Sequence, residues 1–273
     1  MQYYCTYFDA NYLARGLALY ESMAEHCQQF HLWVLALCPE SEHMLRALAL
    51  DDVTVVGLGE FETNSLRTAK KRRTWEEYIF TCTASWMLYV LTYYQVDHLN
   101  YVDADCYFFS SPESVFDEIG DAPVAITPHR WSKSYLHYRV NGIFNVGLVY
   151  VRWCEAGLGC VGEWAAQCLE WCYRRNEGGK FCDQGYLDAW PEKWGAHAIQ
   201  HKGVNLAPWN QGEGHYTYGL QDGLVYVDDD PLVMYHFHQG LGTGYPLDPF
   251  LRAYVYEPYR LALEGAEERI TRC

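Results

Sequence analysis

The chain has 273 residues, of which 50% are hydrophobic and 20% are charged. This length and composition predict one large α/β domain with a sizeable core, and they exclude an intrinsically disordered chain. Its 35 acidic side chains outnumber the 20 lysines and arginines, so the formal net charge is −15. That charge argues against nucleic acid or an anionic membrane as the main partner, because both are polyanions.

The N-terminal residues 1–6 have neither the basic nor the apolar region of a secretory signal, and no segment approaches ~20 consecutive apolar residues. The cysteines, 11 in all, contain no CxxC pair, which disfavours a disulfide framework or a zinc ribbon. Cys168 and Cys172 continue a helical apolar stripe and are expected to pack in the core. These features predict a cytoplasmic protein without a transmembrane segment.

The first sixty residues alternate between strand and helix patterns. We predict strands at 2–8, 30–37 and 53–58, with helices at 11–26 and 39–48. Strands separated by helices of this length are typical of a parallel sheet with covered faces. A long apolar helix at 75–94 then leads into a short strand at 98–102.

The second half of the chain is less regular. We predict strands at 123–127, 145–151 and 232–238 and a helix at 160–174. Residues 176–231 are rich in Gly, Trp, Pro and Tyr and are expected to form loops that line a substrate site. No internal repeat or linker-like segment interrupts the chain, which favours a single domain.

Asp103 and Asp105 follow the strand at 98–102. In extended backbone, residues two apart point the same way, so both carboxylates would face one spot. Two carboxylates at a strand end suit Mg²⁺ or Mn²⁺, which can bridge a diphosphate. The alternative is an ordinary pair of acidic loop residues, because a bare DxD pattern is common.

A second group of polar residues lies in the strand predicted at 232–238. Strand alternation puts His236 and His238 on one face, where one imidazole would complete a metal site with two aspartates and favour Mn²⁺ over Ca²⁺. An equally weighted alternative is that both histidines are hydrogen-bonded residues of a half-buried strand.

Two further clusters carry polar chemistry. Asp183 and Gln184 follow a Gly-Gly turn, where the default role of the aspartate is to cap a helix. The basic run at 70–73 is the only one in an acidic chain. This run would either bind phosphates or form a solvated face of the protein. We favour the solvated face.

Taken together, these segments resemble the GT-A glycosyltransferases, and most closely the retaining, metal-dependent, family 8-like galactosyl- and glucosyltransferases and glycogenin. Five segments occur in the family's order. They are Asp9-Ala10-Asn11-Tyr12, Tyr101-Val102-Asp103-Ala104-Asp105, Phe144-Asn145-Val146-Gly147-Leu148, Asp183-Gln184 and His236-Phe237. The resemblance implies a GT-A (Rossmann-like) α/β fold, with a mostly parallel central sheet, flanking helices and a smaller acceptor-side subregion. Residues 1–110 would bind the nucleotide sugar, 111–249 the donor sugar and acceptor, and 250–273 would form a C-terminal helical element.

The resemblance also implies a role for each matching residue. Asp183 and Gln184 would stand beside the anomeric carbon as the catalytic pair. The metal ligands would be Asp103, Asp105 and His236. Nucleotide-binding residues would be Tyr7, Asp9, Asn11, Tyr12 and Ala104. Contacts to donor sugar or acceptor would come from Asn145, Val146, Gly147, His238, Lys202 and Trp209.

The implied activity is transfer of a hexosyl group from a nucleotide sugar, expected to be a UDP-sugar, with retention of anomeric configuration. The cofactor would be Mn²⁺ or Mg²⁺. The acceptor would be a glycan or lipid-linked glycan, in bacterial surface polysaccharide synthesis. The family's lysine after its HFxG segment is missing here. Lys202, the run at 70–73 and the metal alone all stay open as the group that meets the diphosphate.

Two other functions compete with this one. A sugar-1-phosphate nucleotidylyltransferase shares the Rossmann-like half, but residues 8–12 lack the glycines of its phosphate-binding loop. The other alternative is a GT-A protein that binds a nucleotide or glycan without turnover.

Overall fold

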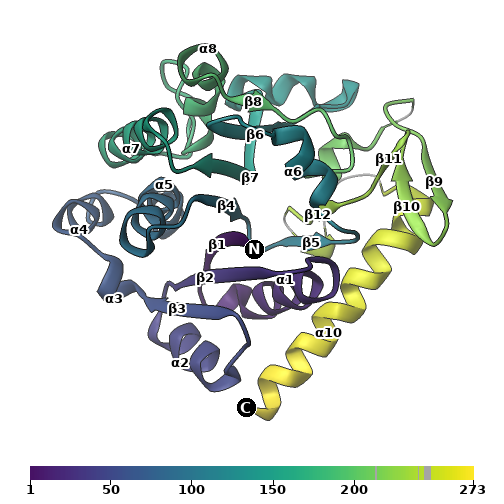
Figure 1. Ribbon diagram of the computed structural model, residues 1–273, viewed down its shortest axis with the longest axis horizontal. Helices are drawn as coiled ribbons and strands as arrows, with labels where there is room; N and C mark the ends of the chain where they lie inside the picture. The colour runs from purple at the N-terminus through teal and green to yellow at the C-terminus, as the bar shows by residue number, and fades with distance from the viewer. Residues whose placement is uncertain (213, 239, 243–246) are drawn as a thin grey trace.

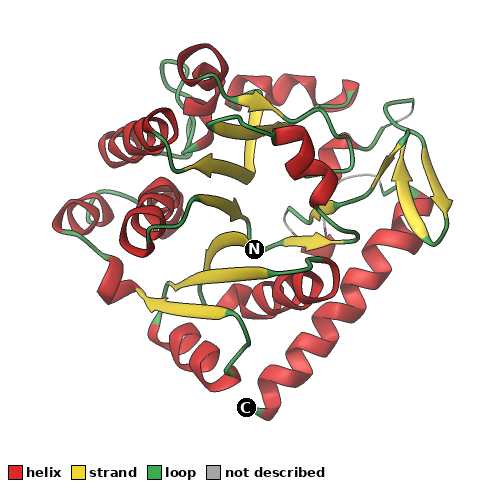
Figure 2. Ribbon diagram, in the orientation of Figure 1, coloured by secondary structure: helices red, strands yellow, loops and turns green. Residues whose placement is uncertain are grey.

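The computed structural model describes residues 1–212, 214–238, 240–242 and 247–273. Its centre is a seven-stranded sheet with the order β3-β2-β1-β4-β7-β6-β8. Figure 2 shows the strands in yellow among the red helices. The strands are β1 (Gln2–Phe8), β2 (Phe30–Ala36), β3 (Val53–Gly57), β4 (His98–Val102), β6 (Val124–Pro128), β7 (Phe144–Arg152) and β8 (His197–Ala198). Neighbours pair in parallel except at β4–β7 and β6–β7. The predicted mostly parallel α/β sheet is therefore confirmed.

Helices cover both faces of this sheet (Figure 1). They are α1 (Leu13–His26), α2 (Pro39–Leu48), α3 (Leu58–Phe61), α4 (Asn64–Lys70), α5 (Trp75–Tyr94), α6 (Glu113–Ile119), α7 (Glu155–Glu170), α8 (Trp190–Trp194), α9 (Pro249–Leu251) and α10 (Glu257–Arg272). The long α5 begins with a capping box, in which Thr74 Oγ1 accepts from Glu77 N and Glu77 Oε2 accepts from Thr74 N.

Most predicted boundaries agree with the structure, and one helix is displaced. The helix predicted at 160–174 runs instead from Glu155 to Glu170. Cys154 caps its N-terminus, and Trp171 is already in an extended conformation. Cys172 thus lies beyond the helix, although it is fully buried as expected. The first predicted helix opens with a 3-10 turn, η1 (Ala10–Tyr12), before α1.

The sheet separates two apolar clusters, because alternate side chains of each strand point to opposite faces. On β1, Tyr4 and Phe8 pack into the cluster that includes α1, whereas Cys5 and Tyr7 pack into the cluster that includes α5 and α7. No helix in the described ranges combines the length and apolar character required to cross a membrane.

Two small sheets lie beside the central one. The first contains β9 (Tyr218–Gln221), β10 (Leu224–Val227) and β11 (Asp230–Pro231), and the second pairs β5 (Cys106–Phe108) with β12 (Met234–His236). The strand predicted at 232–238 is therefore shorter than expected. Antiparallel β5–β12 pairing puts His236 opposite Cys106. This pairing brings His236 next to the Asp103–Asp105 segment.

Several strand ends meet at one edge of the central sheet. Strands β1 and β4 are parallel neighbours, so Asp9 and Asp103 leave the sheet at the same edge. Strand β7 runs antiparallel to β4 and begins there with Phe144, which Asn145 follows. Ligands of open α/β sheets bind at this type of edge.

Candidate active site

A cavity of about 630 Å³ opens at this edge of the sheet. Most of the residues assigned from the sequence line it: Tyr7, Asp9, Asn11, Tyr12, Asp103, Ala104, Asp105, Asn145, Val146, Asp183, Gln184, Trp209, His236 and His238. Segments that are far apart in the sequence are thus brought to one place by the fold. Gln239, which follows His238, lies outside the described residues.

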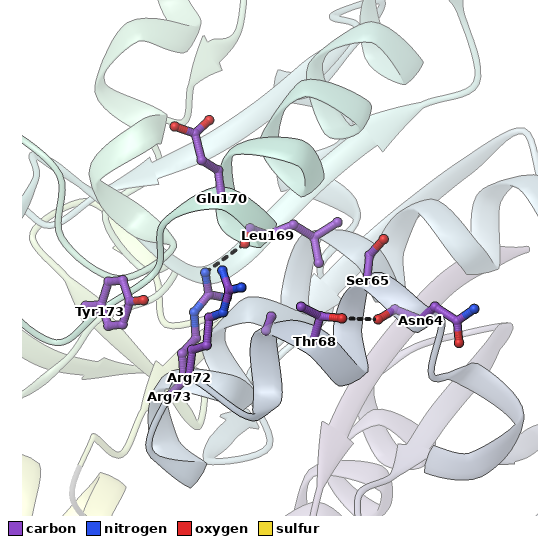
Figure 3. A pocket seen from close by; sticks show the side chains of 9 residues that line it. Asn64, Ser65, Thr68, Arg72, Arg73, Leu169, Glu170 and Tyr173 are labelled. Carbon is purple, nitrogen blue, oxygen red and sulfur yellow. Dashed lines mark hydrogen bonds between the residues drawn. The ribbon is translucent and has the colours of Figure 1, made fainter.

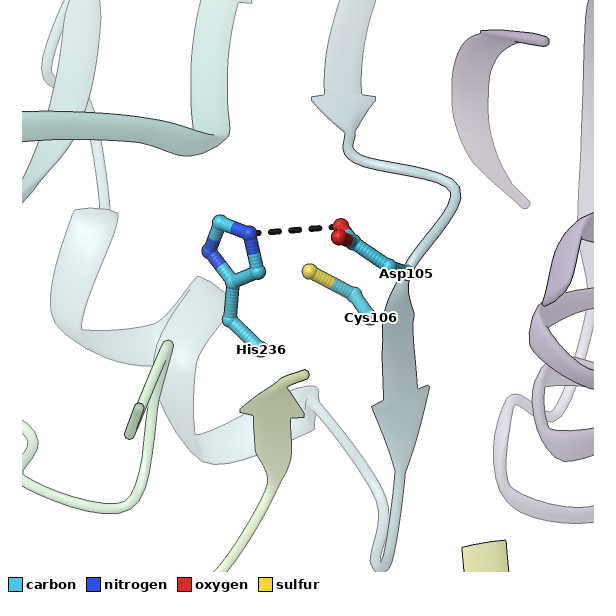
Figure 4. Close-up of side chains that lie close together, drawn as sticks. All are labelled: Asp105, Cys106 and His236. Atoms are coloured by element: carbon cyan, nitrogen blue, oxygen red, sulfur yellow. Dashed lines mark ion pairs between the residues drawn. The ribbon is translucent and has the colours of Figure 1, made fainter. Parts of the chain in front are cut away.

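The two aspartates are brought together by a turn, and not by strand alternation as expected. Strand β4 ends at Val102, and Cys106 N donates to Asp103 O at 3.0 Å. This turn lets Asp103 and Asp105 face the same imidazole. His236 Nε2 lies 3.2 Å from Asp105 Oδ1, as drawn in Figure 4, and 3.6 Å from Asp103 Oδ2.

The orientation of His236 is fixed from behind by Asn205. The amide nitrogen of Asn205 donates to Thr127 Oγ1 at 2.7 Å and to Asn145 Oδ1 at 2.8 Å. Its oxygen therefore faces His236 Nδ1, at 3.2 Å, and accepts the proton that Nδ1 carries. In the neutral ring, the lone pair of Nε2 then points at the two carboxylates.

Three lone-pair donors that face one another in a buried place repel unless a proton or a cation lies between them. Burial lowers the pKa of His236, but the charges of Asp105 and Asp103 more than offset this and raise it above its ordinary value. Two carboxylate oxygens and one imidazole nitrogen, with the far nitrogen held by an amide, are a donor set that fits Mn²⁺ or Mg²⁺.

Cys106 adjoins this group, and its sulfur lies within 4.8 Å of the ligand atoms of Asp105 and His236. Burial raises the pKa of this thiol well above its ordinary value. Its Sγ donates weakly to Gly147 O at 3.7 Å. A protonated thiol is a poor ligand for a hard cation, so Asp103 is the better third ligand.

Gly147 lies directly behind the group, where a side chain would collide with it. A Cβ at Gly147 would lie 2.6 Å from each of three polar atoms: Asn145 Oδ1, Asn205 Oδ1 and His236 Nδ1. Gly147 N also donates to Asn145 Oδ1 at 2.8 Å. The glycine of this segment therefore allows the amide–imidazole network to close.

Asp183 is held at the other side of the cavity by a chain of hydroxyls. Thr83 Oγ1 donates to Asp183 Oδ2 at 2.8 Å and lies 2.8 Å from the hydroxyl of Tyr7. Trp164 Nε1 donates to the backbone carbonyl of Asp183 at 2.8 Å. Asp183 occupies the N-cap position of the following 3-10 helix η3 (Gln184–Ala189), as the default expectation had it, but its side chain makes no capping bond there.

The environment of Asp183 changes its acidity. Burial raises its pKa from 3.8 to about 7; the hydrogen bond from Thr83 opposes this shift and the nearby charge of Asp103 adds to it. The carboxylate is only 5% exposed. Asp183 is thus poised to change its protonation near neutral pH.

At the mouth of the cavity, Asp9 is fixed by its neighbours. Asn11 N donates to Asp9 Oδ1 at 2.9 Å, and Trp75 Nε1 donates to Asp9 Oδ2 at 3.3 Å. The rings of Tyr12 and Trp75 also line this part and are 38% and 41% exposed. Exposed aromatic faces beside an oriented carboxylate suit a flat heterocycle with N–H groups.

Aromatic rings line another part of the cavity. His129 stacks on Trp131, with ring centroids 4.2 Å apart. Trp209 packs edge-to-face against His236 and His238, with both centroid distances 5.5 Å. Both histidines line the cavity, but β12 ends at His236, so His238 reaches the cavity from beyond the strand and not by strand alternation.

Lys202 is a correction to the sequence-based assignment, because it does not line the cavity. Its Nζ lies 2.8 Å from Asp228 Oδ2. Asn205, three residues later, takes the inward position by adopting a left-handed backbone with φ of 54°.

The basic run at 70–73 also lies elsewhere. Arg72 and Arg73 line a separate hollow of about 460 Å³ between α4 and the end of α7 (Figure 3). Arg73 Nη2 donates to Leu169 O at 2.9 Å, and Lys71 and Arg72 are exposed. The solvated-face interpretation fits this arrangement better than a contact with the donor.

Sequence reasoning missed several residues that shape the site. Thr83 is buried within an apolar helical pattern, and nothing local marks it as a partner of Asp183. Asn205 and Trp75 contact the site from other segments. The one available signal was Asn205 in the irregular stretch 202–210, since asparagine is enriched at left-handed positions.

No protein-family model matches the chain. It is 32% identical over 240 residues to the uncharacterized protein YfnD of Bacillus subtilis (strain 168), which covers 86% of this chain and 76% of YfnD. The chain belongs to the YfnD family. YfnF of the same organism is 28% identical over 244 residues, 86% of this chain and 80% of YfnF.

Solved structures show which fold this YfnD-family chain has. The galactosyltransferase LgtC, in complex with donor and acceptor sugar analogues, superposes with a TM-score of 0.60 at 14% identity, over 97% of this chain and 96% of LgtC. The YfnD-family chain therefore has the GT-A glycosyltransferase fold, as the resemblance implied.

The raised pKa of Asp183 predicts a pH-dependent cost in stability. As pH rises from about 4 to about 7, the unfolded carboxyl ionises before the folded one, so the fold loses stability over this window, by about 4 kcal/mol in full. Asp183→Asn should therefore be more stable than the wild type at pH 8 and similar at pH 4. Urea unfolding at several pH values measures this.

Asp121→Asn is the matched control, because Asp121 is exposed, pairs with Arg152 and does not line the cavity. It should show no such trend. A stability difference between Asp183→Asn and the wild type that does not grow between pH 4 and 8 would contradict the assigned acidity.

The close contacts of Gly147 predict that Gly147→Ala disrupts the network around His236. The added methyl group must push aside two amide oxygens and the imidazole, so we expect a loss of roughly 1–3 kcal/mol. Gly162→Ala is the control, because a Cβ there meets nothing within 4 Å on α7. It should be neutral or stabilise the helix by about 0.5–1 kcal/mol. Equal effects of the two substitutions on the melting temperature would contradict this account.

Proposed function

We propose that this protein is a metal-dependent glycosyltransferase that moves a hexosyl group from a nucleotide sugar, a UDP-sugar by preference, to a glycan acceptor. The observation that carries the proposal is the convergence of Asp103, Asp105 and His236 Nε2 in the cavity that also contains Asp183. This donor set calls for a divalent cation. The GT-A fold, which LgtC shares, supports the transferase class.

Mn²⁺ or Mg²⁺ held by these residues would supply Lewis-acid stabilisation of the negative charge that develops on the departing diphosphate. Side chains of the protein would bind the base and the donor sugar. Asp9 would accept a hydrogen bond from the base, and Tyr12 would offer it a ring face. Asn145 and Val146 would line the space for the donor sugar.

Asp183 is proposed to stand beside the anomeric carbon, where its ionised carboxylate would stabilise positive charge on the sugar. Thr83 and Tyr7 keep this carboxylate in one orientation through their hydroxyls. The rings of Trp131 and Trp209 would shield the reacting sugar from water. Retention of anomeric configuration is proposed from the family resemblance, as is the nearby role of Gln184.

The biological setting is proposed more broadly. A glycan or lipid-linked glycan acceptor, and bacterial surface polysaccharide synthesis, agree with relatives in a bacterium. All 11 cysteines are free, which suits a reducing cytoplasm. The chain leaves β1 through a 3-10 turn at residues 10–12, so no glycine-rich loop supports the nucleotidylyltransferase alternative.

The test is turnover of UDP- and GDP-sugars with Mn²⁺, followed by release of the nucleoside diphosphate. Asp105→Asn should lose at least about 100-fold in kcat/KM, because the diphosphate charge is then poorly stabilised. Asp183→Asn should also lose turnover while remaining folded. Asp229→Asn, which changes a carboxylate that does not line the cavity, should keep the wild-type rate.

A fully active Asp105→Asn variant would refute the metal role. If the wild type binds nucleotide with Mn²⁺ but turns over no sugar nucleotide across a broad acceptor panel, the protein is instead a catalytically silent binder.

A further inference from the structure

The cavity has too much negative charge for an anionic donor. Five carboxylates line it: Asp9, Glu76, Asp103, Asp105 and Asp183. Among the described lining residues the one lysine or arginine is Arg174, and its Nη1 is paired with Glu76 Oε2 at 2.9 Å. A single divalent ion at best neutralises Asp103 and Asp105. A diphosphate therefore requires another positive group close by.

Arg15, on the first turn of α1, does not line the cavity itself but packs directly behind residues that do. Its guanidinium carbon is 4.2 Å from the centroid of the Tyr12 ring, which lines the cavity. The guanidinium also packs against the backbone at Gly240. Gly240 N donates to Phe237 O at 2.7 Å, and Phe237 N donates to Asp105 O at 2.8 Å, so Arg15 lies behind the backbone that pairs with Asp105.

Among the described residues, no carboxylate forms an ion pair with Arg15, although its side chain is half-buried. The backbone at Gly240 packs against the charge, since a Cβ there would lie only 2.8 Å from Arg15 Nη2. A half-buried cation is stabilised when an anion completes its hydrogen bonds.

A second unpartnered donor lies in the same neighbourhood. Tyr259 of α10 is fully buried, and its hydroxyl has no hydrogen-bond partner within the described part of the chain. Its ring stacks on Phe237, with centroids 3.7 Å apart, and Phe237 N donates to Asp105 O. Two donors therefore adjoin the backbone that pairs with Asp105, on the α1 and α10 side of the metal group.

The geometry points to Arg15 as the residue that binds the diphosphate of the donor. This inference rests on the proposed function. A nucleotide with its base at Asp9 and Tyr12 and its metal at Asp103 and Asp105 must run its diphosphate between them, beside Arg15. The planar fork of a guanidinium matches two phosphate oxygens, and its stacking on Tyr12 fixes its direction. Arg15 thus makes the site selective for diphosphates over monophosphates.

The experiment is isothermal titration of the full chain with UDP and UMP, with GDP and GMP in parallel, at fixed Mn²⁺. Arg15→Gln should weaken binding of the preferred diphosphate by about tenfold or more, since a charged hydrogen-bonded pair is lost. Its monophosphate affinity should fall much less. Arg15→Lys should recover part of the loss. Arg46→Gln, which changes an arginine paired with Glu42 outside the cavity, should bind like the wild type.

Unchanged diphosphate affinity in Arg15→Gln overturns the inference and leaves the proposed function standing. An equal loss for the diphosphate and the monophosphate also overturns it, because Arg15 would then only support the Tyr12 ring. If Arg15→Gln lowers the melting temperature, Arg15→Met keeps the aliphatic packing and replaces it in the same titration. A wild type that binds none of these nucleotides contradicts the proposed function itself, and with it this inference.

Discussion

The close approach of Asp103, Asp105 and His236 Nε2 is the constraint on which the rest of the site depends. These groups are held together by backbone, through the turn after β4 and the pairing of β12 with β5. Their lone pairs repel one another unless a proton on His236, whose pKa the carboxylates raise, or a divalent cation lies between them. The network behind His236 prevents the ring from turning away.

That network reaches across the molecule. Asn205 holds His236, Asn145 holds Asn205, and His129 lies 3.3 Å from the amide nitrogen of Asn145. Gly147 has no side chain and so leaves room for the polar atoms of Asn145, Asn205 and His236 to approach one another. On the opposite wall, Tyr7 and Thr83 play the same part for Asp183. Tyr7 and Thr83 belong to β1 and α5 of the central fold, whose elements are more rigid than loops, whereas Asn205 holds His236 from a loop.

Much of the fold could be predicted from the sequence, because local sequence signals agree with the tertiary structure. The predicted boundaries of β1, α2, α5 and β4 are the observed ones, since in these elements the apolar periodicity ends where capping or turn residues begin. Both ends of α7 were predicted wrongly, the start because a cysteine is an unusual cap and the end because the apolar pattern continues past Glu170. The sheet of β9, β10 and β11 was missed because its strands have only two to four residues.

The site was predictable where a motif follows a strand, as at Asp9, Asp103 and Asp105, and where His236 completes a donor set. Thr83, Asn205 and Arg15 could not be found in this way. Their importance lies in partners 100, 31 and 3 residues away, and it depends on which face of a helix or loop turns inward. Lys202 is the opposite error, because it was assigned to the site from the sequence but pairs with Asp228 outside the cavity.

Anomalous diffraction from crystals grown with Mn²⁺ and UDP tests the central claim most directly. The account predicts one strong manganese peak within coordination distance of Asp103, Asp105 and His236 Nε2, with the diphosphate of UDP beside it. A site that stays free of manganese while UDP is bound, or a manganese ion held elsewhere in the cavity, would contradict it.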